Sequence, residues 1–505
     1  MKKTLCIAVI LCIIIVSGCS VREQPETVYA ESEQRLMQDF FIAKTENKQL
    51  KEDIRFEYDS ASRTYSYVTQ RLIQGLDSMR PTFFADGDAY VGEEEQLTGI
   101  TACDFRRRNV VYTVRNTREL TQQTCTVSIV SPQTTGLPIL RIDIAGNKEV
   151  ENRETYLPAT YVLNATDTTI LGTLEIRGRG NSTWWPSKKP YKIKLTEPQQ
   201  MFDMHKARTW VLLANALDPT LLTNDVGLEI ARRMELPHTN HTQHIELYVN
   251  GSYRGNYLLT EQIDIHKGRV EADTLSGGWL IEIDSNYDKD LKFKTSGYQL
   301  PIMMRKPENT QAMEEVRQYF AELEKQLQKS QPDYNKLSQL VDMPSLARYL
   351  LFNDLVSNGE LGHPKSVFCF RRNNAAPLEW GPAWDFDWAF GYVGSKYVYF
   401  HNAERLTFDL SQRPVQAAGT GGKFFSRFFL MPEFVELYRS EWQRVAPALQ
   451  DIDEYAWRQG MMLDLSWLEN QKRWQTPDIS KRYYYMGMMA YLDKRIDVMT
   501  KNIAQ

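Results

Sequence analysis

The chain has 505 residues, of which 42% are hydrophobic and 25% are charged, and its formal net charge is -4. A chain of this length exceeds one ordinary hydrophobic core, so we expect two or three domains. The composition excludes a wholly disordered chain and one embedded in a membrane along its length. The charges form no long run of one sign, which argues against nucleic acid as a partner.

The first residues resemble a lipoprotein signal. The positive start MKK precedes the short apolar stretch TLCIAVILCIIIV, and Ser17 and Gly18 then stand before Cys19. We predict a signal peptide over residues 1–18, lipidation at Cys19 and a polar tether over 19–35. An uncleaved membrane anchor is the alternative, which the shortness of the apolar stretch disfavours. In both cases the body of the protein is expected in the cell envelope, outside the cytoplasm, facing the periplasm or the cell surface.

Residues 36–132 are typical of a small Ig-like β-sandwich. The segments FFADGDAYV, NVVYTVRN and TCTVSIV alternate in period two and are separated by turn residues. Cys103 and Cys125 either form a disulfide here or remain two separately buried thiols. Cys369, in SVFCF, is predicted to be a core residue of a strand. The 36–132 region has no convergent set of His, Asp or Cys, so we expect a spacer or adhesion role.

From residue 138 onwards a β-rich part precedes a helical part, which predicts the α+β class. Asn250-Gly251 joins two alternating segments, as in a hairpin with a type I′ turn. One helix is predicted between the strands, with Asn224 or Asp225 as its N-cap. The apolar face of this helix consists of Leu222, Val226, Ile230 and Met234. In the last third of the chain we expect helices over 312–327, 343–357, 426–449 and 484–503. A strand pair over 365–372 and 379–388 interrupts them.

Three histidines, His238, His241 and His244, are spaced three residues apart. On a helix this spacing would form a metal-binding face. The strand and turn signals around them favour an extended loop instead, in which the three imidazoles need not converge.

The segment GPAWDFDWAFG places Asp385 and Asp387 among aromatic residues. Desolvating a carboxylate costs several kcal/mol or more unless a partner neutralises its charge, so a cation is implied. The candidates are an Arg or Lys side chain, a divalent metal ion, and a helix N-terminus.

A glycine-rich turn and a lysine-bearing strand precede this segment. Gly178 and Gly180 allow the backbone to approach a ligand, and Arg177 and Arg179 supply positive charge; an ordinary hairpin is the simpler interpretation. In the strand that follows, Lys192 and Lys194 point to one face.

Protein kinases hold nucleotide phosphates with such a turn and lysine, and a helix glutamate pairs with the lysine. Glu229 is a candidate for that glutamate, and pairing with Arg232 or Arg233 is the alternative. The counterpart of a catalytic loop is expected in NDLVSNGELGHPKS, which offers Asn358, Glu360, His363 and Lys365.

The ordered motifs IRGRGNSTW, KKPYKIKL, WVLLANALDPTLL, LYVNGSYRGNYLLTEQI, GGWLIEID and WDFDWAFG resemble the spore coat protein H (CotH) kinase family over residues 138–445. The resemblance implies a kinase-like domain over 138–505 with an atypical two-lobed fold, a β-rich N-lobe and a helical C-lobe. It also implies ATP- and Mg²⁺-dependent transfer of phosphate to Ser or Thr of a protein. By similarity, Lys192 or Lys194 would contact phosphates, and Asp385, with Asp387, would bind Mg²⁺.

The chain departs from the family pattern Asn-x-Asp-x-x-x-x-Asn, because Glu360 and Lys365 replace the last two of these residues. Glu360 can still accept a hydroxyl proton, but its extra methylene displaces the carboxylate, which can cost on the order of 100-fold in rate. Lys365 cannot ligate Mg²⁺ and could instead neutralise phosphate charge. The expected location outside the cytoplasm also has no assured ATP supply. Because of this and the two replacements, the alternative to a kinase is a non-catalytic surface module that binds glycan or protein.

Overall fold

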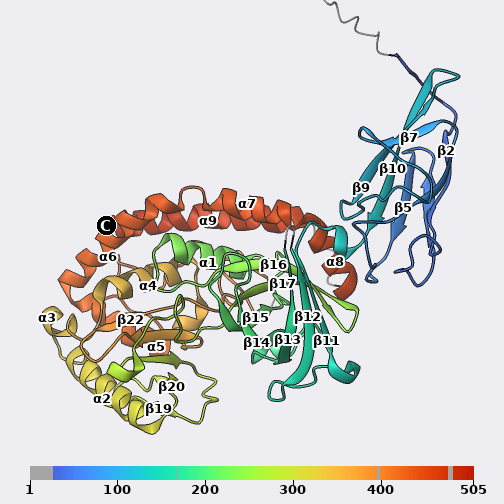
Figure 1. Cartoon of the computed structure of the whole chain (residues 1–505). Coiled ribbons are helices and arrows are strands. Elements are labelled where there is room, and N and C mark those ends of the chain that lie inside the picture. Colours follow the sequence, from blue (N-terminus) through green and yellow to red (C-terminus); the bar gives the residue numbers. More distant parts are fainter. Residues whose placement is uncertain (1–26, 166–167, 395–397, 476–480, 505) are drawn as a thin grey trace, which may run out of the picture. The chain divides into compact units, whose positions relative to one another are not determined.

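The computed structural model describes residues 27–165, 168–394, 398–475 and 481–504 (Figure 1). The predicted signal peptide and Cys19 lie outside these residues. Among the described helices, none is both long and apolar enough to span a bilayer. The chain divides into two compact units: Met1–Tyr67, Ser78–Cys103 and Asn109–Ser128 form the first, and the remaining residues form the second.

The first unit consists of β-sheets. Phe40 in the three-stranded sheet contacts Tyr65 and Tyr112 of the larger sheet, with ring centroids 5.4 Å apart in each pair. Cys103 and Cys125 are buried and form no disulfide, so the disulfide alternative is wrong in this structure. The Ig-like assignment stays a prediction. In the larger sheet the neighbouring strands are, in order, β4 (Glu57–Asp59), β5 (Thr64–Val68), β10 (Thr121–Val130), β9 (Asn109–Asn116), β7 (Asp88–Val91) and β8 (Glu94–Glu95). Strand β1 (Ala30–Glu31) also pairs with β10. In the smaller sheet the order is β3 (Ile54–Arg55), β2 (Met37–Ile42) and β6 (Thr82–Ala85).

The second unit begins with a closed seven-stranded barrel. Its interior is apolar because alternate residues point inward, for example Tyr191, Ile193 and Leu195, while Lys192 and Lys194 face outward. The strands follow the order β11 (Ile139–Ile144), β12 (Leu157–Asn164), β13 (Thr169–Gly178), β14 (Tyr191–Gln199), β15 (Ala207–Leu213), β17 (Ser252–Glu261) and β16 (Thr242–Val249), and β16 closes the barrel on β11.

The turn between β16 and β17 is the predicted hairpin turn. Asn250 and Gly251 have φ angles of 52° and 72°, the positive values that a type I′ turn requires.

Helix α1 (Thr223–Arg233) connects β15 to β16, as predicted, but its first turn differs from the prediction. The N-cap is Leu222, and neither Asn224 nor Asp225 caps the helix. Asp218 instead accepts hydrogen bonds from the amide and hydroxyl of Thr223, at 2.8 and 2.9 Å. This leaves the Asn224 side chain free to make tertiary contacts.

A five-stranded sheet links the barrel to the helices. The sheet runs β19 (Lys292–Lys294), β20 (Pro301–Lys306), β18 (Trp279–Ile283), β21 (Val367–Arg371), β22 (Leu378–Trp380). The strand predicted over 379–388 ends at Trp380, because Pro382 has no amide donor for a ladder. Asp385 and Asp387 therefore lie on an irregular loop after the sheet. Cys369 is fully buried in β21, as predicted.

The helices form the rest of the second unit. The helix predicted over 426–449 is interrupted before Pro432, which occupies the first turn of a new helix where no amide is needed. Four α-helices of the described residues were not predicted: α7 (Ile452–Met462), α8 (Asp464–Trp474), and the shorter α3 (Tyr334–Leu337) and α5 (Gly419–Ser426). The others are α2 (Thr310–Leu327), α4 (Met343–Leu355), α6 (Pro432–Val445) and α9 (Lys481–Ile503).

Candidate active-site cleft

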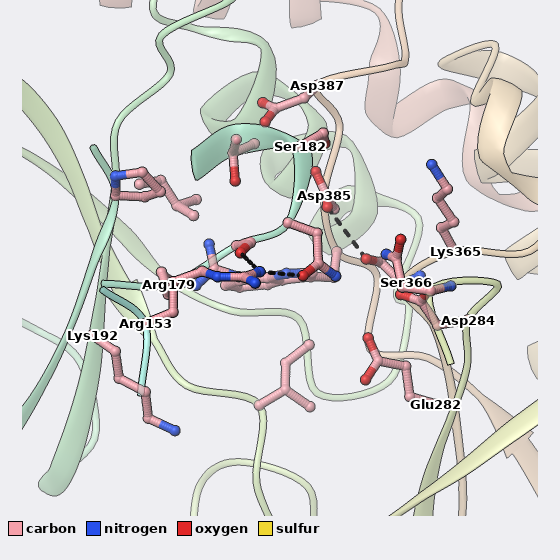
Figure 2. A pocket seen from close by; sticks show the side chains of 18 of the residues that line it. Arg153, Arg179, Ser182, Lys192, Glu282, Asp284, Lys365, Ser366, Asp385 and Asp387 are labelled. Carbon is pink, nitrogen blue, oxygen red and sulfur yellow. Dashed lines mark hydrogen bonds between the residues drawn. The ribbon is translucent and has the colours of Figure 1, made fainter. Parts of the chain in front are cut away.

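A cleft of about 590 Å³ in the second unit brings the glycine turn, strand β14 and the acidic loop together (Figure 2). This volume is within the range of small-molecule sites. Positively and negatively charged side chains share its wall. The charged lining residues are Arg153, Glu154, Arg177, Arg179, Lys192, Glu282, Asp284, Asp288, Lys289, Arg305, Glu360, Lys365, Asp385 and Asp387.

The acidic loop is held by the first turn of α1. Asn224 donates from Nδ2 to Oδ1 of Asp387 at 2.8 Å, and its Oδ1 accepts from the amide of Phe386 at 3.1 Å. Gly227 makes room for the Phe386 ring, since a Cβ there would lie 2.5 Å from Cδ2 of that ring. Phe386 is fully buried, so apolar packing fixes the backbone between the two aspartates.

Asp385 and Asp387 point into the same part of the cleft (Figure 2). Burial and the neighbouring charge of Asp385 raise the pKa of Asp387 to about 7. Asp385 has a φ of 63° and accepts a hydrogen bond from the Ser366 hydroxyl at 3.2 Å. Of the neighbouring aromatic residues, Trp384 is buried, whereas Trp388 is 40% exposed. The carboxylates thus share one half-buried site and compete for stabilising partners.

The cation that sequence reasoning required is only partly supplied by protein. The Arg179 guanidinium interacts electrostatically with both aspartates, and burial lowers its pKa while they oppose this shift. Within the described ranges, no side-chain ion pair within 4.0 Å joins Arg179 to Asp385 or Asp387. The two aspartates are therefore not neutralised by a direct ion pair with Arg179. The cleft that they line also includes the glycine turn.

The glycine turn forms the basic side. Arg153 donates to the carbonyl of Gly180 and to Oδ1 of Asn181, both at 2.6 Å, which fixes the turn. Gly180 needs its φ of 83°, and a Cβ there would lie 2.0 Å from Oγ1 of Thr183. Lys192 also lines the cleft, and burial followed by repulsion from Arg177 lowers its pKa to about 8.

Glu360 lies in a short 3-10 turn (Gly359–Leu361) capped by Asn358, whose Oδ1 accepts from the Glu360 amide at 3.0 Å. Burial, and then the charge of Asp385, raise the pKa of Glu360 to about 9. Its Oε2 is buried without a hydrogen-bond partner. Lys365 lies over the Trp388 ring, with Nζ 4.5 Å from the centroid, and lines the same cleft. Asn358 supports the backbone here and His363 is not among the lining residues.

Glu282, Asp284, Arg305 and Ser366 are among the lining residues that had no role in the sequence reasoning. Burial raises the pKa of Glu282 to about 7, although Arg305 lies 3.3 Å away and opposes the shift. Asp284 accepts the Ser366 amide at 3.1 Å, and burial raises its pKa. Glu282 and Asp284 both belong to the GGWLIEID motif, which includes β18 and ends one residue after it. The sequence analysis used this motif only for the family resemblance and assigned no function to either residue.

Three residues predicted for nucleotide binding lie elsewhere. Glu229 binds Arg232 and Arg233 on its own helix, so its predicted pairing with a strand lysine is corrected. Lys194 is exposed and lies 3.9 Å from Glu175, because it stands one repeat further from the cleft along β14. Gly178 packs against Trp184, whose ring a Cβ would meet at 2.3 Å, and therefore has a packing role.

The cleft suits a divalent ion bound to a phosphate-bearing ligand. Asp284, Asp385 and Asp387 offer carboxylate oxygens, which Mg²⁺ prefers, and the unpartnered Oε2 of Glu360 is a further oxygen with no protein donor. Arg179 and Lys192 provide positive charge for phosphate oxygens on the opposite wall (Figure 2).

The sequence model of the family described as CotH kinase protein matches residues 174–498, which is more than half of the chain. The matched residues include only part of the barrel. Strands β11 and β12 belong to the same barrel but precede the first matched residue. A search of curated proteins returned no match.

Proposed function

Because the chain belongs to the CotH kinase family, we propose that it transfers the γ-phosphoryl group of ATP to a Ser or Thr hydroxyl of an envelope protein, with Mg²⁺ as cofactor. The observation that carries this proposal is the convergence of Asp385, Asp387, Glu360 and Lys192 on one cleft beside the glycine turn. Phosphoryl transfer depends mainly on positioning and on stabilising negative charge, and this cleft offers both.

In this proposal Asp385 and Asp387 hold the metal ion, with Asp284 as an additional acid. Mg²⁺ would supply charge neutralisation between the phosphates. Asn224 keeps Asp387 oriented through its 2.8 Å hydrogen bond, and Ser366 does the same for Asp385. Arg179 and Lys192 bind the phosphate oxygens, and Lys365 neutralises charge near the transferred group, where family members have an asparagine.

Glu360 would accept the proton of the acceptor hydroxyl. Its pKa of about 9 means that the carboxyl group is protonated at neutral pH in the free protein. Since part of this shift comes from the charge of Asp385, neutralising Asp385 lowers the pKa of Glu360 and favours the basic form. Activity is therefore expected to increase as pH rises and Glu360 loses its proton, in a range below the free-protein pKa of about 9.

The test is incubation of the purified chain and envelope extract with radiolabelled ATP and Mg²⁺. We expect labelled protein with the unaltered chain, and none with Asp385→Asn. Asp497→Asn is the matched control, because Asp497 lies on the surface of α9, paired with Lys501. Equal labelling by Asp385→Asn would eliminate the proposal.

The alternative function is a non-catalytic module that binds glycan or protein. It is favoured by one observation, the placement of Lys365 over Trp388 instead of a metal-binding asparagine. Calorimetry separates the two functions. Binding of ATP with Mg²⁺ supports the kinase, whereas no binding of nucleotide together with affinity for a polysaccharide supports the module.

We also propose that the chain is lipid-anchored at Cys19 in the cell envelope. This rests on the MKK start, the apolar stretch and the Ser-Gly-Cys pattern alone. Metabolic labelling with a radioactive fatty acid should mark the unaltered protein and not Cys19→Ser. Labelling of both would refute lipidation at this residue.

A further inference from the structure

A cluster of two histidines and a glutamate lies at one end of the barrel and is separate from the acidic loop. His205 belongs to the connection between β14 and β15, His241 precedes β16, and Glu261 ends β17. Their candidate ligand atoms all lie within 4.8 Å of one another. Only His241 belongs to the histidine series that the sequence singled out. His238 packs against Phe370, and His244 is buried beside Asn256.

The backbone fixes two of these side chains relative to each other. The amide of His241 donates to Oε2 of Glu261 at 2.7 Å, and the carbonyl of His241 accepts from the Thr260 hydroxyl at 2.8 Å. The other carboxylate oxygen, Oε1, faces Nδ1 of His241 at 3.2 Å. The Glu261 side chain is only 4% exposed, so Oε1 is directed at this imidazole and not into bulk solvent.

The third side chain is placed by a glycine. A Cβ at Gly268 would lie 2.1 Å from Cδ2 of His205, so the imidazole lies directly against this glycine and would have to shift if the residue were larger. The His205 and His241 rings have centroids 6.0 Å apart. His205 is exposed, which leaves the cluster accessible to an ion from solvent.

We propose that His205, His241 and Glu261 bind one Zn²⁺ ion, with water as the fourth ligand. Two imidazoles and one carboxylate suit zinc, whereas Mg²⁺ and Ca²⁺ favour all-oxygen sites. Tetrahedral zinc with bonds of about 2.0–2.1 Å places its ligand atoms about 3.3 Å apart. The Nδ1–Oε1 separation of 3.2 Å already matches this value.

A competing cation lies nearby, but it does not occupy the site. Arg269 donates from Nη1 to the carbonyls of Thr209 and Gln262, while its Nε and Nη2 make no hydrogen bond. Its charge interacts with Glu261 and reduces the electrostatic attraction of the site for any cation, so the affinity for zinc would depend on the two imidazoles. Gln262 and Ile263, which follow Glu261 directly, line the cleft. The ion would therefore tie three barrel connections together at the edge of the cleft, independently of any phosphoryl transfer.

The test is zinc binding by the whole chain after removal of any affinity tag and dialysis against a chelator. Calorimetric titrations with Zn²⁺ are performed in the Asp385→Asn background and in excess Mg²⁺, so that the cleft carboxylates do not contribute. We expect one equivalent of zinc, lost in both His205→Gln and His241→Gln. His266→Gln is the matched control, because the exposed His266 ring contacts the neighbouring Lys267 carbonyl through Nδ1 and lies outside the cluster.

Two further readouts confirm the ligand set. Co²⁺ in place of Zn²⁺ should give the intense visible absorption of a tetrahedral site, absent from His205→Gln. Zinc should raise the thermal unfolding midpoint of the unaltered chain and leave that of His205→Gln unchanged. Because His205 is exposed, this variant is expected to fold. Absence of stoichiometric binding, or retention of the zinc equivalent by either His205→Gln or His241→Gln, would overturn the proposal.

Discussion

Individual acidic residues in the cleft are held in protonation states that they would not have in water. Burial and the charge of Asp385 raise the pKa values of Glu360 and Asp387, to about 9 and about 7. Groups whose charged forms are disfavoured in this way gain from a bound cation, so we expect a site of this composition to cost stability when it holds no cation.

Replacing Glu360 by glutamine should remove one of these costs. The folded state binds the Glu360 proton more tightly than the unfolded state does, so stability falls as pH rises from about 4.5 to about 9. Near pH 9 we expect Glu360→Gln to gain a few kcal/mol of unfolding free energy over the unaltered chain, because its amide stays neutral while the buried carboxyl group must ionise, and each unit of pKa shift corresponds to about 1.4 kcal/mol. Below pH 4.5 the gain should vanish.

Urea unfolding across this pH range measures the effect. Glu404→Gln is the control, because the Glu404 side chain is 77% exposed and should show little change. Identical pH profiles for Glu360→Gln and the unaltered chain would contradict the assigned pKa of Glu360. The same variant should lose phosphoryl transfer, so stability and activity are expected to change in opposite directions.

At the scale of elements, α1 determines where the acidic loop lies. Glycine is a poor helix former, and replacing it by alanine in an exposed helix gains about 1 kcal/mol. Gly227 is an exception because it faces the buried ring of Phe386.

We therefore expect Gly227→Ala to destabilise the protein by about 1–3 kcal/mol, the cost of overpacking a core. It should also weaken Mg²⁺-ATP binding, since displacement of Phe386 moves both flanking aspartates. Urea unfolding and calorimetry measure the two effects. Gly487→Ala in α9, where the nearest atom lies 3.2 Å away at the edge of the Phe400 ring, is the matched control. A more stable Gly227→Ala protein would contradict this packing.

Across the whole second unit, one buried arginine joins distant segments. Arg495 on α9 is fully buried and pairs with Asp354 of α4 at 3.1 Å. Its guanidinium also donates to backbone carbonyls of Leu355, Ala403 and Arg405. Removing it leaves the buried Asp354 charge without an ion-pair partner, held only by the amides of Thr407 and Phe408, and leaves several carbonyls without their side-chain donor.

Arg495→Met should therefore cost about 3–5 kcal/mol of unfolding free energy, the usual result of breaking a buried ion pair. Asp354→Asn added to this variant should recover part of the loss, because it removes the unpaired charge. Lys494→Met is the control, since Lys494 pairs with the exposed Glu404 and should change stability by less than about 1 kcal/mol. A loss no greater than that of Lys494→Met would show that the buried pair does not hold the helices together.

Local patterns predicted the hairpin at Asn250-Gly251, the helix that became α1, and the alternation that turns Lys192 outward from the barrel. They failed where the decisive contact was tertiary. The predicted roles of Glu229 and Lys194 depended on the direction and distance of a cleft that spacing along the chain does not show. Pro382 ended the acidic strand early, a local signal that the prediction did not use.

The sequence alone determined the class of residues in the site, the acidic pair, the glycine turn and the strand lysine, because these reside in short segments with local conformational preferences. Only the tertiary structure decided that Asn224 orients Asp387, that Asp284 joins the cleft from another strand, and that His205 and Glu261 meet His241. Such contacts join residues far apart in the chain, and their geometry depends on how the barrel closes and packs.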